Sequence, residues 1–253
     1  MPVRARPAAT VILLRDGAPG LEVLLLKRHA RTLFGPGASV FPGGAVDAVD
    51  AGPDQPPCNL DDATASAELG LTTAGLAYRM AAIRECFEEA GILLAQHTDG
   101  SPITMDHPDM LRRFEQRREA LRHQRLSLAE LCRHEDLQVY GSRLHYVSHW
   151  ITPAYSPKRF DTRFFLAVVP PRQEATCCGR ETVDQYWTTP EAGLEAHRSG
   201  ELDLMTPTSD TLERLRRYAS TGAVIAELAR GKERQGSAIP GHGLMEQRFP
   251  DPA

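Results

Sequence analysis

Short apolar runs near the start of the chain have the length and composition of β-strands. Residues 9–14 and 21–27 are rich in Val, Ile and Leu, and a turn-forming segment, Asp-Gly-Ala-Pro-Gly, lies between them at residues 16–20. This arrangement predicts two neighbouring strands at the beginning of a sheet. Similar runs predict further strands at residues 146–151, 163–169 and 183–187.

A longer apolar pattern with helical spacing runs through residues 76–94. Met80, Ile83 and Phe87 are three or four positions apart and so lie on one side of a helix, and Gly91 is a suitable residue to end it. Other helices are predicted between residues 108 and 137, where there are two, and at residues 190–199 and 208–230. Strands mixed with helices in this way predict an α/β/α layered fold with a mixed sheet.

The length of 253 residues suits one large domain with insertions, so we predict a single domain over residues 1–253. Residues 35–44 contain four glycines and two prolines and predict a structured loop. Residues 48–75 are polar and lack sustained periodicity, which predicts an exposed insertion. A second, helical insertion is predicted at residues 99–137, and the tail from about residue 231 is predicted to be poorly ordered.

Composition and charge narrow the class of protein. The 29 basic and 33 acidic side chains give a net charge of only −4, which argues against a general binder of nucleic acids or membrane surfaces. The five cysteines are odd in number and form no C-x-x-C pair, so neither a disulfide framework nor a zinc site is indicated. No segment has the pattern of a signal peptide or a membrane span, and we expect a cytoplasmic protein.

Three carboxylates stand out in the predicted helix. Glu85, Glu88 and Glu89 fall within an arc of roughly 100° on a helix that turns about 100° per residue. Like charges at this spacing repel each other, so a positive group is expected beside them. Arg84 is one such group, but one guanidinium cannot neutralise three acids. Either the acids form an ordinary solvated face, or their hard oxygen atoms bind Mg²⁺ or Mn²⁺.

The residues around these acids resemble the signature of the Nudix hydrolases, G-x5-E-x7-R-E-U-x-E-E-x-G-U, where U is a bulky apolar residue. Residues 84–92, Arg-Glu-Cys-Phe-Glu-Glu-Ala-Gly-Ile, match its second half at every fixed position. In the first half, Gly44 is followed by Asp50 where the signature has glutamate, and 33 residues rather than seven then lead to Arg84. The resemblance therefore implies a Nudix-type α/β/α sandwich whose signature is split by an insertion of 26 residues.

The same resemblance implies the roles of several residues in metal-assisted hydrolysis of a diphosphate linkage. The implied metal ligands are Glu85, Glu88, Glu89 and a carbonyl oxygen of Gly43 or Gly44. Arg84 would orient the cluster, and Asp50 would replace the first acid of the signature. Nudix enzymes often take a further acid from a later loop as a ligand or base; Glu181 is the candidate, with Glu174 and Asp184 as alternatives.

Residues outside the signature bear on the substrate. Residues 24–28 and 37–44 resemble part of a motif of coenzyme A diphosphatases, although Leu33 stands where that motif has arginine. A broader resemblance is to the Nudix 19 type of CoA and acyl-CoA diphosphatases, carried by residues 40–44, 82–85, 150–153 and 159–165. It implies cleavage of CoA or acyl-CoA to 3′,5′-ADP and 4′-phosphopantetheine or its acyl form. The implied substrate-binding residues are Arg28, Phe41, Gly43, Gly44 and Arg159.

Two other functions stay open. One is a Nudix hydrolase for ADP-ribose, NADH or a nucleotide sugar, and the other is a Nudix fold that binds a ligand without catalysis. The helical insertion carries arginines that either contact substrate phosphates or, as interleaved Glu115 and Glu119 favour, form a salt-bridged outer face. These arginines are Arg112, Arg113, Arg117, Arg118, Arg122 and Arg125. The expected partner is a small diphosphate molecule, and a homodimer is possible through the insertion.

Overall fold

A β-sheet forms the centre of the computed structural model, which describes residues 3–32, 35–177, 179 and 181–234. Five strands lie in the order β3-β2-β1-β8-β7, while β4 pairs with β1 and β9 pairs with β2. Over these residues the strands of this sheet are β1 (Arg6–Gly17), β2 (Gly20–Arg28), β3 (Ser39–Val40), β4 (Gly43–Ala45), β7 (His145–Ile151), β8 (Phe160–Val168) and β9 (Thr182–Thr188). Among the described strands of this sheet only β1 and β8 pair in parallel, so the sheet is mixed, as predicted.

The central strand β1 changes its partner along its length. Residues 14–17 pair with β2 across a tight hairpin, whereas residues 8–10 pair with β4. On its other side, residues 6–14 pair with β8. The glycine-rich segment that ends in β4 therefore lies against the first half of β1, and β4 precedes the predicted acidic helix in the chain.

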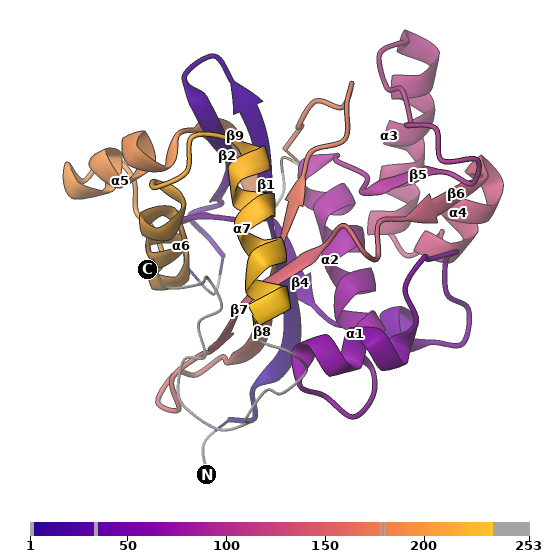
Figure 1. Cartoon of the computed structure of the whole chain (residues 1–253), viewed down its shortest axis with the longest axis horizontal. Helices are drawn as coiled ribbons and strands as arrows, with labels where there is room; N and C mark the ends of the chain where they lie inside the picture. Colours follow the sequence, from indigo (N-terminus) through magenta and orange to yellow (C-terminus); the bar gives the residue numbers. More distant parts are fainter. Residues whose placement is uncertain (1–2, 33–34, 178, 180, 235–253) are drawn as a thin grey trace.

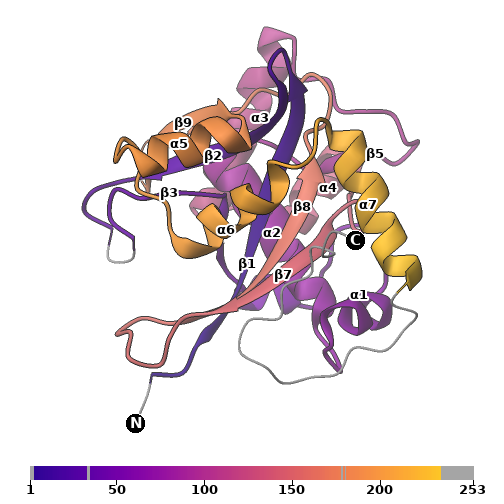
Figure 2. The same ribbon diagram turned by 60° about the vertical axis from the view of Figure 1, so that its left-hand side comes forward.

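Helices cover both faces of the sheet, and Figures 1 and 2 show the two groups. Alternate side chains of a strand point to opposite faces, so Val11 and Leu13 of β1 enter one core while Ile12 and Leu14 enter the other. The first core lies under α1 (Asp62–Leu69), α2 (Gly75–Ala90), α3 (Pro108–Arg122), α4 (Leu128–Glu135) and the small sheet of β5 (Ala95–His97) and β6 (Leu137–Val139). The second lies under α5 (Pro190–Arg198), α6 (Thr206–Leu215) and α7 (Thr221–Arg234). The predicted α/β/α sandwich is confirmed.

The helix predicted at residues 76–94 is α2, but it is shorter at its C-terminal end. It stops at Ala90, and Gly91 then takes a left-handed conformation with φ 71°. Ile92 and Leu94 continue the apolar pattern because they are fully buried as part of a loop. The prediction extended the helix wrongly because burial, rather than helical structure, maintained the periodicity.

The helix predicted at residues 208–230 is wrong as a single element. Residues 206–215 form α6 and residues 221–234 form α7. Asp16 at the β1–β2 turn caps the start of α7, since its carboxylate accepts hydrogen bonds from the backbone N–H and the hydroxyl of Thr221, both at 2.7 Å. Helix α7 continues through residue 234, and most of the tail predicted from about residue 231 lies outside the described residues. Over the described residues, no helix is both long and apolar enough to cross a membrane.

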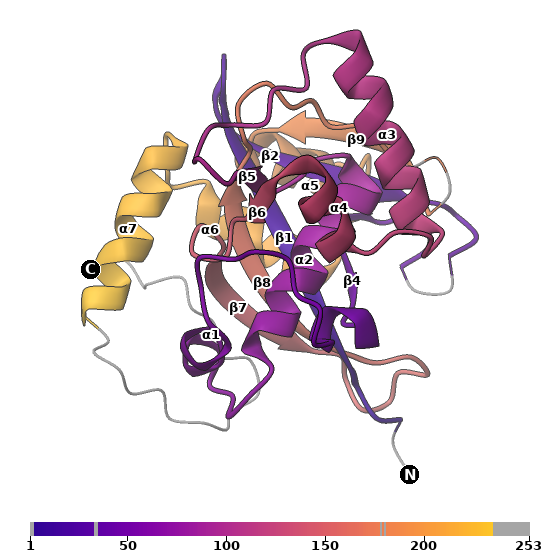
Figure 3. The same ribbon diagram turned by 90° about the vertical axis from the view of Figure 1, so that its right-hand side faces the viewer.

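The segment at residues 48–75, predicted as an exposed insertion, has many exposed residues but also helical structure. It contains a short 3-10 helix, η1 (Ala48–Ala51), and the helix α1, which lies beside α2 in Figure 3. Its side chains bind the first turn of α2: Asp62 accepts from the N–H groups of Ala74 and Leu76 at 3.0 and 2.9 Å, and Ser66 accepts from Gly75 at 2.8 Å. The insertion therefore supplies the cap that the N-terminus of α2 lacks in its own sequence.

Gly75 tests this close packing of α1 on α2. A Cβ at this position would overlap the backbone of Ala65 and Ser66, so Gly75→Ala forces α1 away from α2. We expect the free energy of unfolding to fall by about 2 kcal/mol, measured by urea unfolding. Gly222→Ala in α7 is the control, because only the Ser220 hydroxyl lies within 4 Å of its added Cβ. The control should keep or slightly raise stability, and equal losses in both variants would contradict the packing argument.

Candidate functional site

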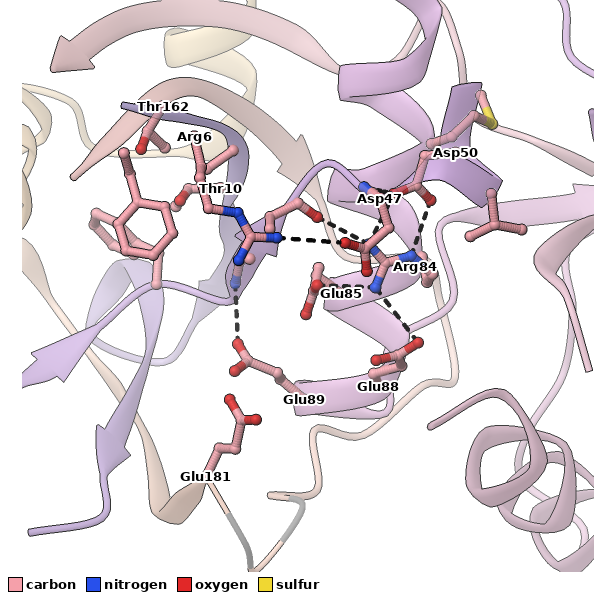
Figure 4. Close-up of a pocket in the computed structure, with 18 of the residues that line it drawn as sticks. Arg6, Thr10, Asp47, Asp50, Arg84, Glu85, Glu88, Glu89, Thr162 and Glu181 are labelled. Carbon is pink, nitrogen blue, oxygen red and sulfur yellow. Dashed lines mark hydrogen bonds and ion pairs between the residues drawn. The ribbon is translucent and has the colours of Figure 1, made fainter. Parts of the chain in front are cut away.

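Arg84 is the centre of a group of acidic side chains on and beside α2 (Figure 4). Its guanidinium is bound on one side by both oxygens of Asp50, with Nε–Oδ1 and Nη2–Oδ2 distances of 2.9 and 2.8 Å. On the other side, Nη1 lies 2.8 Å from Glu85 and 3.6 Å from Glu88. The structure thus brings the two halves of the split signature together, with Arg84 between Asp50 and two of the acids, and its role in orienting the cluster stays a prediction.

Asp50 has a positioning role in this arrangement. Its side chain is buried, and besides holding Arg84 it accepts a hydrogen bond from the backbone N–H of Asp47 at 2.8 Å, which closes a capping box around η1. Both carboxylate oxygens are therefore occupied by donors of the protein itself. The 26 residues of the insertion leave this acid in place because η1 folds immediately after β4 and turns Asp50 back towards α2.

The two glycines of β4 let the sheet approach the acids of α2 closely. The backbone N–H of Gly43 donates to Oε2 of Glu89 at 3.0 Å. Gly44 faces Glu85 so closely that a Cβ on it would overlap the carboxylate, and a Cβ on Gly43 would overlap β1 at Ala9 and Thr10. A side chain at Gly43 would force β4 away from β1, and one at Gly44 would displace the Glu85 carboxylate, which gives both glycines of the motif a steric reason.

Burial makes the negative charge of these acids costly. It raises the pKa of Glu85 to about 7, and the Arg84 guanidinium opposes that rise. Burial also raises the pKa of Glu88, again against Arg84. For Glu89, burial and then the charge of Glu85 raise the pKa well above its usual range, while the Gly43 N–H favours the ionised form. A further positive charge beside the cluster would therefore stabilise the ionised carboxylates.

The chemistry of this donor set fits a divalent cation such as Mg²⁺ or Mn²⁺. The groups are carboxylates, hard oxygen donors that these ions prefer, and Mg²⁺ keeps several waters and needs only one or two protein carboxylates. In the arrangement seen, no three acidic, histidine or cysteine side chains of the described residues are gathered as a ready-made metal site. Glu85 and Glu88 turn to Arg84, and Glu89 turns to Gly43. Metal binding by these residues therefore stays a prediction.

A cavity of about 1420 Å³ opens from the carboxylates. Predicted site residues from several elements line it: Asp50, Arg84, Glu85, Glu88, Glu89, Gly43, Gly44, Arg28, Phe41 and Glu181. Figure 4 shows Glu181 beside Glu89, and its charge contributes to the raised pKa of Glu89. Glu174 and Asp184, the alternatives to Glu181, are not among the described residues that line the cavity.

Arg159 is not brought to the site. Its guanidinium donates to the backbone carbonyls of Thr152 and Val3 at 2.9 and 2.7 Å, and it does not belong to the described lining of the cavity. Through these hydrogen bonds the arginine joins the β7–β8 connection to the N-terminal segment. Arg28 and Phe41 do line the cavity, and a shift in the β2–β9 register between Lys27 and Arg28 turns the strand at this point.

The arginines of the helical insertion have separate environments. The ion pairs are Arg112 with Asp109, Arg113 and Arg117 with Glu135, and Arg122 with Glu119. Arg118 is buried within the protein, while Arg122 and Arg125 line the cavity. The predicted salt-bridged face is thus only part of the pattern, because Arg113 and Arg117 pair with the buried Glu135 of α4. Of the described residues of α3, Leu121 and Arg122 line the cavity.

Parts of the cavity wall had no signal in the sequence. These residues include Arg6 and Asp47, which pair at 3.9 Å, the α3–α4 connection and the start of α6. Their side chains belong to elements far apart in the chain, and no local spacing connects them. Tertiary packing alone assembles this wall. The described cysteines, Cys58, Cys86, Cys132 and Cys177, are free thiols.

Comparison with known proteins agrees with the geometry. The model of the NUDT19 Nudix domain matches residues 52–215. The chain is 31% identical to the human acyl-coenzyme A diphosphatase NUDT19 over 237 residues, which cover 80% of this chain and 62% of that protein. Its counterpart from Gallus gallus is 30% identical, over 85% of this chain and 69% of that protein. A crystal structure of a NUDIX hydrolase from Alicyclobacillus acidocaldarius superimposes with a TM-score of 0.70 at 30% identity and covers 88% of this chain and 96% of that one.

The sandwich, the Arg84 cluster and these matches together define the family: the chain belongs to the Nudix hydrolases. Within them it has the NUDT19 type of Nudix domain, and the matched region includes both insertions except residues 48–51 of the first. The chain spans about three fifths of the length of the human relative.

Breaking the pair of Asp50 with Arg84 should be costly. Asp50→Asn places an amide donor against the guanidinium and leaves a buried charge without its partner, so we expect a loss of about 3 kcal/mol in the free energy of unfolding. Asp47→Asn is the matched control: its carboxylate lies 3.7 Å from Arg84 but is 46% exposed, and its loss should stay below about 1 kcal/mol. Urea unfolding measures both, and similar losses would contradict the importance of the buried pair.

The raised pKa of Glu85 predicts how stability varies with pH when divalent metal is removed by EDTA. A carboxyl whose pKa is higher in the folded protein stabilises the fold below its unfolded pKa, and this stabilisation is lost as pH rises through the folded value near 7. Between pH 5 and pH 8 we expect a loss of up to about 3 kcal/mol from this group. Glu85→Gln should flatten the profile, and parallel profiles for both proteins would refute the assignment.

Proposed function

We propose that this protein is a metal-dependent diphosphatase that acts on CoA or acyl-CoA and releases 3′,5′-ADP and 4′-phosphopantetheine or its acyl form. The observation that carries the proposal is the cluster on α2: three mostly buried carboxylates, held by Arg84 and β4, at the wall of a large cavity. The similarity to proteins named acyl-coenzyme A diphosphatases supports the choice of substrate. A non-catalytic module has no need for three carboxylates whose burial is so costly.

The size and lining of the cavity suit an extended substrate. Its volume of about 1420 Å³ exceeds the usual range of about 300–1,000 Å³ for pockets that bind a compact small molecule. Aromatic and cationic side chains lie together on one wall, where Trp150, Phe160, Lys158 and Arg6 are found. Such residues suit a base and its phosphates, while the apolar wall around Leu126 and Leu128 suits the rest of the molecule.

The residues of the site have distinct tasks in this reaction. Water attacks one phosphorus atom, the bond from that phosphorus to the bridging oxygen breaks, and the two phosphate products share the added water. When bound, Mg²⁺ or Mn²⁺ neutralises charge on the diphosphate and activates water. Glu85, Glu88 and Glu89, with a carbonyl of Gly43 or Gly44, would hold the ion. Glu181 would take the proton of the water, and Arg28 would bind a phosphate oxygen; both residues line the cavity.

Product analysis with a panel of substrates tests the proposal. CoA, an acyl-CoA, ADP-ribose and NADH are incubated with the protein in Mg²⁺ and in Mn²⁺, and the products are separated by chromatography. We expect CoA-type substrates to give 3′,5′-ADP. Turnover of ADP-ribose or NADH without turnover of CoA would instead favour the second candidate, a Nudix hydrolase of dinucleotides or nucleotide sugars.

A substitution at Glu88 tests the metal role. Glu88→Gln keeps the size of the side chain but removes its charge, and we expect turnover to fall by about 100-fold or more, because metal ions supply several kcal/mol of charge stabilisation. Asp54→Asn is the control, since Asp54 lines the same cavity but pairs with Arg133 and not with α2. The control should retain its rate within about twofold. An unchanged rate in Glu88→Gln would show that the metal site is wrongly assigned.

A further inference from the structure

The last turn of α2 has a complete set of hydrogen-bond donors, although it is enclosed by protein. The last four carbonyls of a helix have no partner inside the helix. In α2 these are the carbonyls of Phe87, Glu88, Glu89 and Ala90. The N–H of Gly91 reaches Phe87 at 3.0 Å, and the N–H of Thr176, from the loop after β8, reaches Ala90 at 2.8 Å. The carbonyls of Glu88 and Glu89, two of the proposed metal ligands, need donors from elsewhere.

Arg118 of α3 supplies both missing donors. Its Nε donates to the carbonyl of Glu88 at 3.1 Å, and its Nη2 donates to the carbonyl of Glu89 at 3.0 Å. The remaining donors bind Thr176, with Nη2 reaching its carbonyl at 2.8 Å and Nη1 its hydroxyl at 2.7 Å. One guanidinium thus joins the helical insertion, the end of α2 and the loop after β8.

The charge of Arg118 is stabilised in an unusual way. The side chain is 1% exposed, and its ion pair with Glu115 is long, 3.4 Å, to a carboxylate side chain that is 59% exposed. Its guanidinium also donates to two backbone carbonyls at the negative end of α2, where a cation is favourable for the helix dipole. It also opposes the repulsion between that dipole and the acids of α2, which lie at the unfavourable end for negative charge.

We propose that Arg118 is a positioning residue that fixes the end of α2 and thereby the Glu88 and Glu89 carboxylates for metal binding. The guanidinium binds the backbone carbonyls of Glu88 and Glu89, whose side chains line the cavity. A shift of the helix end would therefore move both carboxylates. The inference rests on the proposed function only in taking Glu88 and Glu89 as metal ligands. The helical insertion therefore serves the catalytic helix from outside the cavity, through a residue that does not touch the substrate.

Binding of Mn²⁺ by the purified protein, without substrate, tests this role. Free Mn²⁺ is followed by electron paramagnetic resonance during titration of the wild type and of Arg118→Met, which keeps bulk but removes the donors. We expect the Kd for Mn²⁺ to rise by about 10- to 100-fold, as for other residues that orient metal ligands. In turnover assays kcat should fall while KM changes little. A folded Arg118→Met protein that binds Mn²⁺ like the wild type would overturn the proposal.

Two arginines serve as matched controls. Arg79 is also fully buried and binds backbone carbonyls, those of Gly141 and Leu144, but it lies at the other end of α2. Arg79→Lys should lower the melting temperature and leave the Kd for Mn²⁺ within about twofold, because its partners are not metal ligands. Arg117→Met removes the neighbouring arginine on α3, which pairs with Glu135, and should change neither value strongly. An equal effect on Mn²⁺ binding in Arg79→Lys would reduce Arg118 to a structural role.

A milder pair of variants covers the case in which Arg118→Met does not fold. Thr176→Val removes the hydroxyl that accepts from Arg118 but keeps the backbone bonds, and Thr176→Ser restores it. Weaker Mn²⁺ binding in the valine variant, recovered with serine, supports the proposal, and wild-type binding in both contradicts it. Wild-type protein that binds Mn²⁺ but leaves CoA intact would refute the proposed substrate and not the role of Arg118.

Discussion

The buried pair of Arg84 with Asp50 is the interaction on which the candidate site depends. Three carboxylates on one helical turn repel one another, and Arg84 faces two of them only because Asp50 holds its other edge. The same aspartate closes η1, which directly follows β4. A single charged pair therefore links the glycine-rich strand, the first insertion and the acidic helix, and the glycines permit the close approach that this link requires.

Both insertions act on α2, one at each end. Asp62 and Ser66 of α1 bind the N–H groups at its start, and Arg118 of α3 binds the carbonyls at its finish. A helix that carries three carboxylates near its C-terminal end, one buried and two partly buried, is poorly suited to stability by itself. The added segments compensate for this by satisfying backbone groups that the helix leaves open, and this explains how a split signature retains a defined geometry.

Much of the fold was predictable because its signals are local. Periodicity located β1, β2 and α2, and the spacing of the acids with Arg84 identified the cluster. Prediction failed where burial or polarity was misleading: Ile92 and Leu94 extended the helical pattern from within a loop, and the polar residues of α1 concealed a helix. Asp50 was expected to replace the first acid of the signature, but no spacing predicted its contacts with Arg84 and with the backbone of Asp47. The buried role of Arg118 depends on Thr176, 58 positions later, and no sequence spacing reveals such a contact.

The parallel pairing of β1 with β8 has a consequence for how this protein folds during its synthesis on the ribosome. Arg6 pairs with Phe160, so the central strand of the sheet lacks one neighbour until well over half of the chain has been synthesised. Until then the nascent chain exposes an apolar strand edge of the kind that pairs readily with other chains, and contacts of such long range also form slowly. The cavity wall that β8 contributes is therefore completed late, and an N-terminal fragment ending before β8 lacks the finished site.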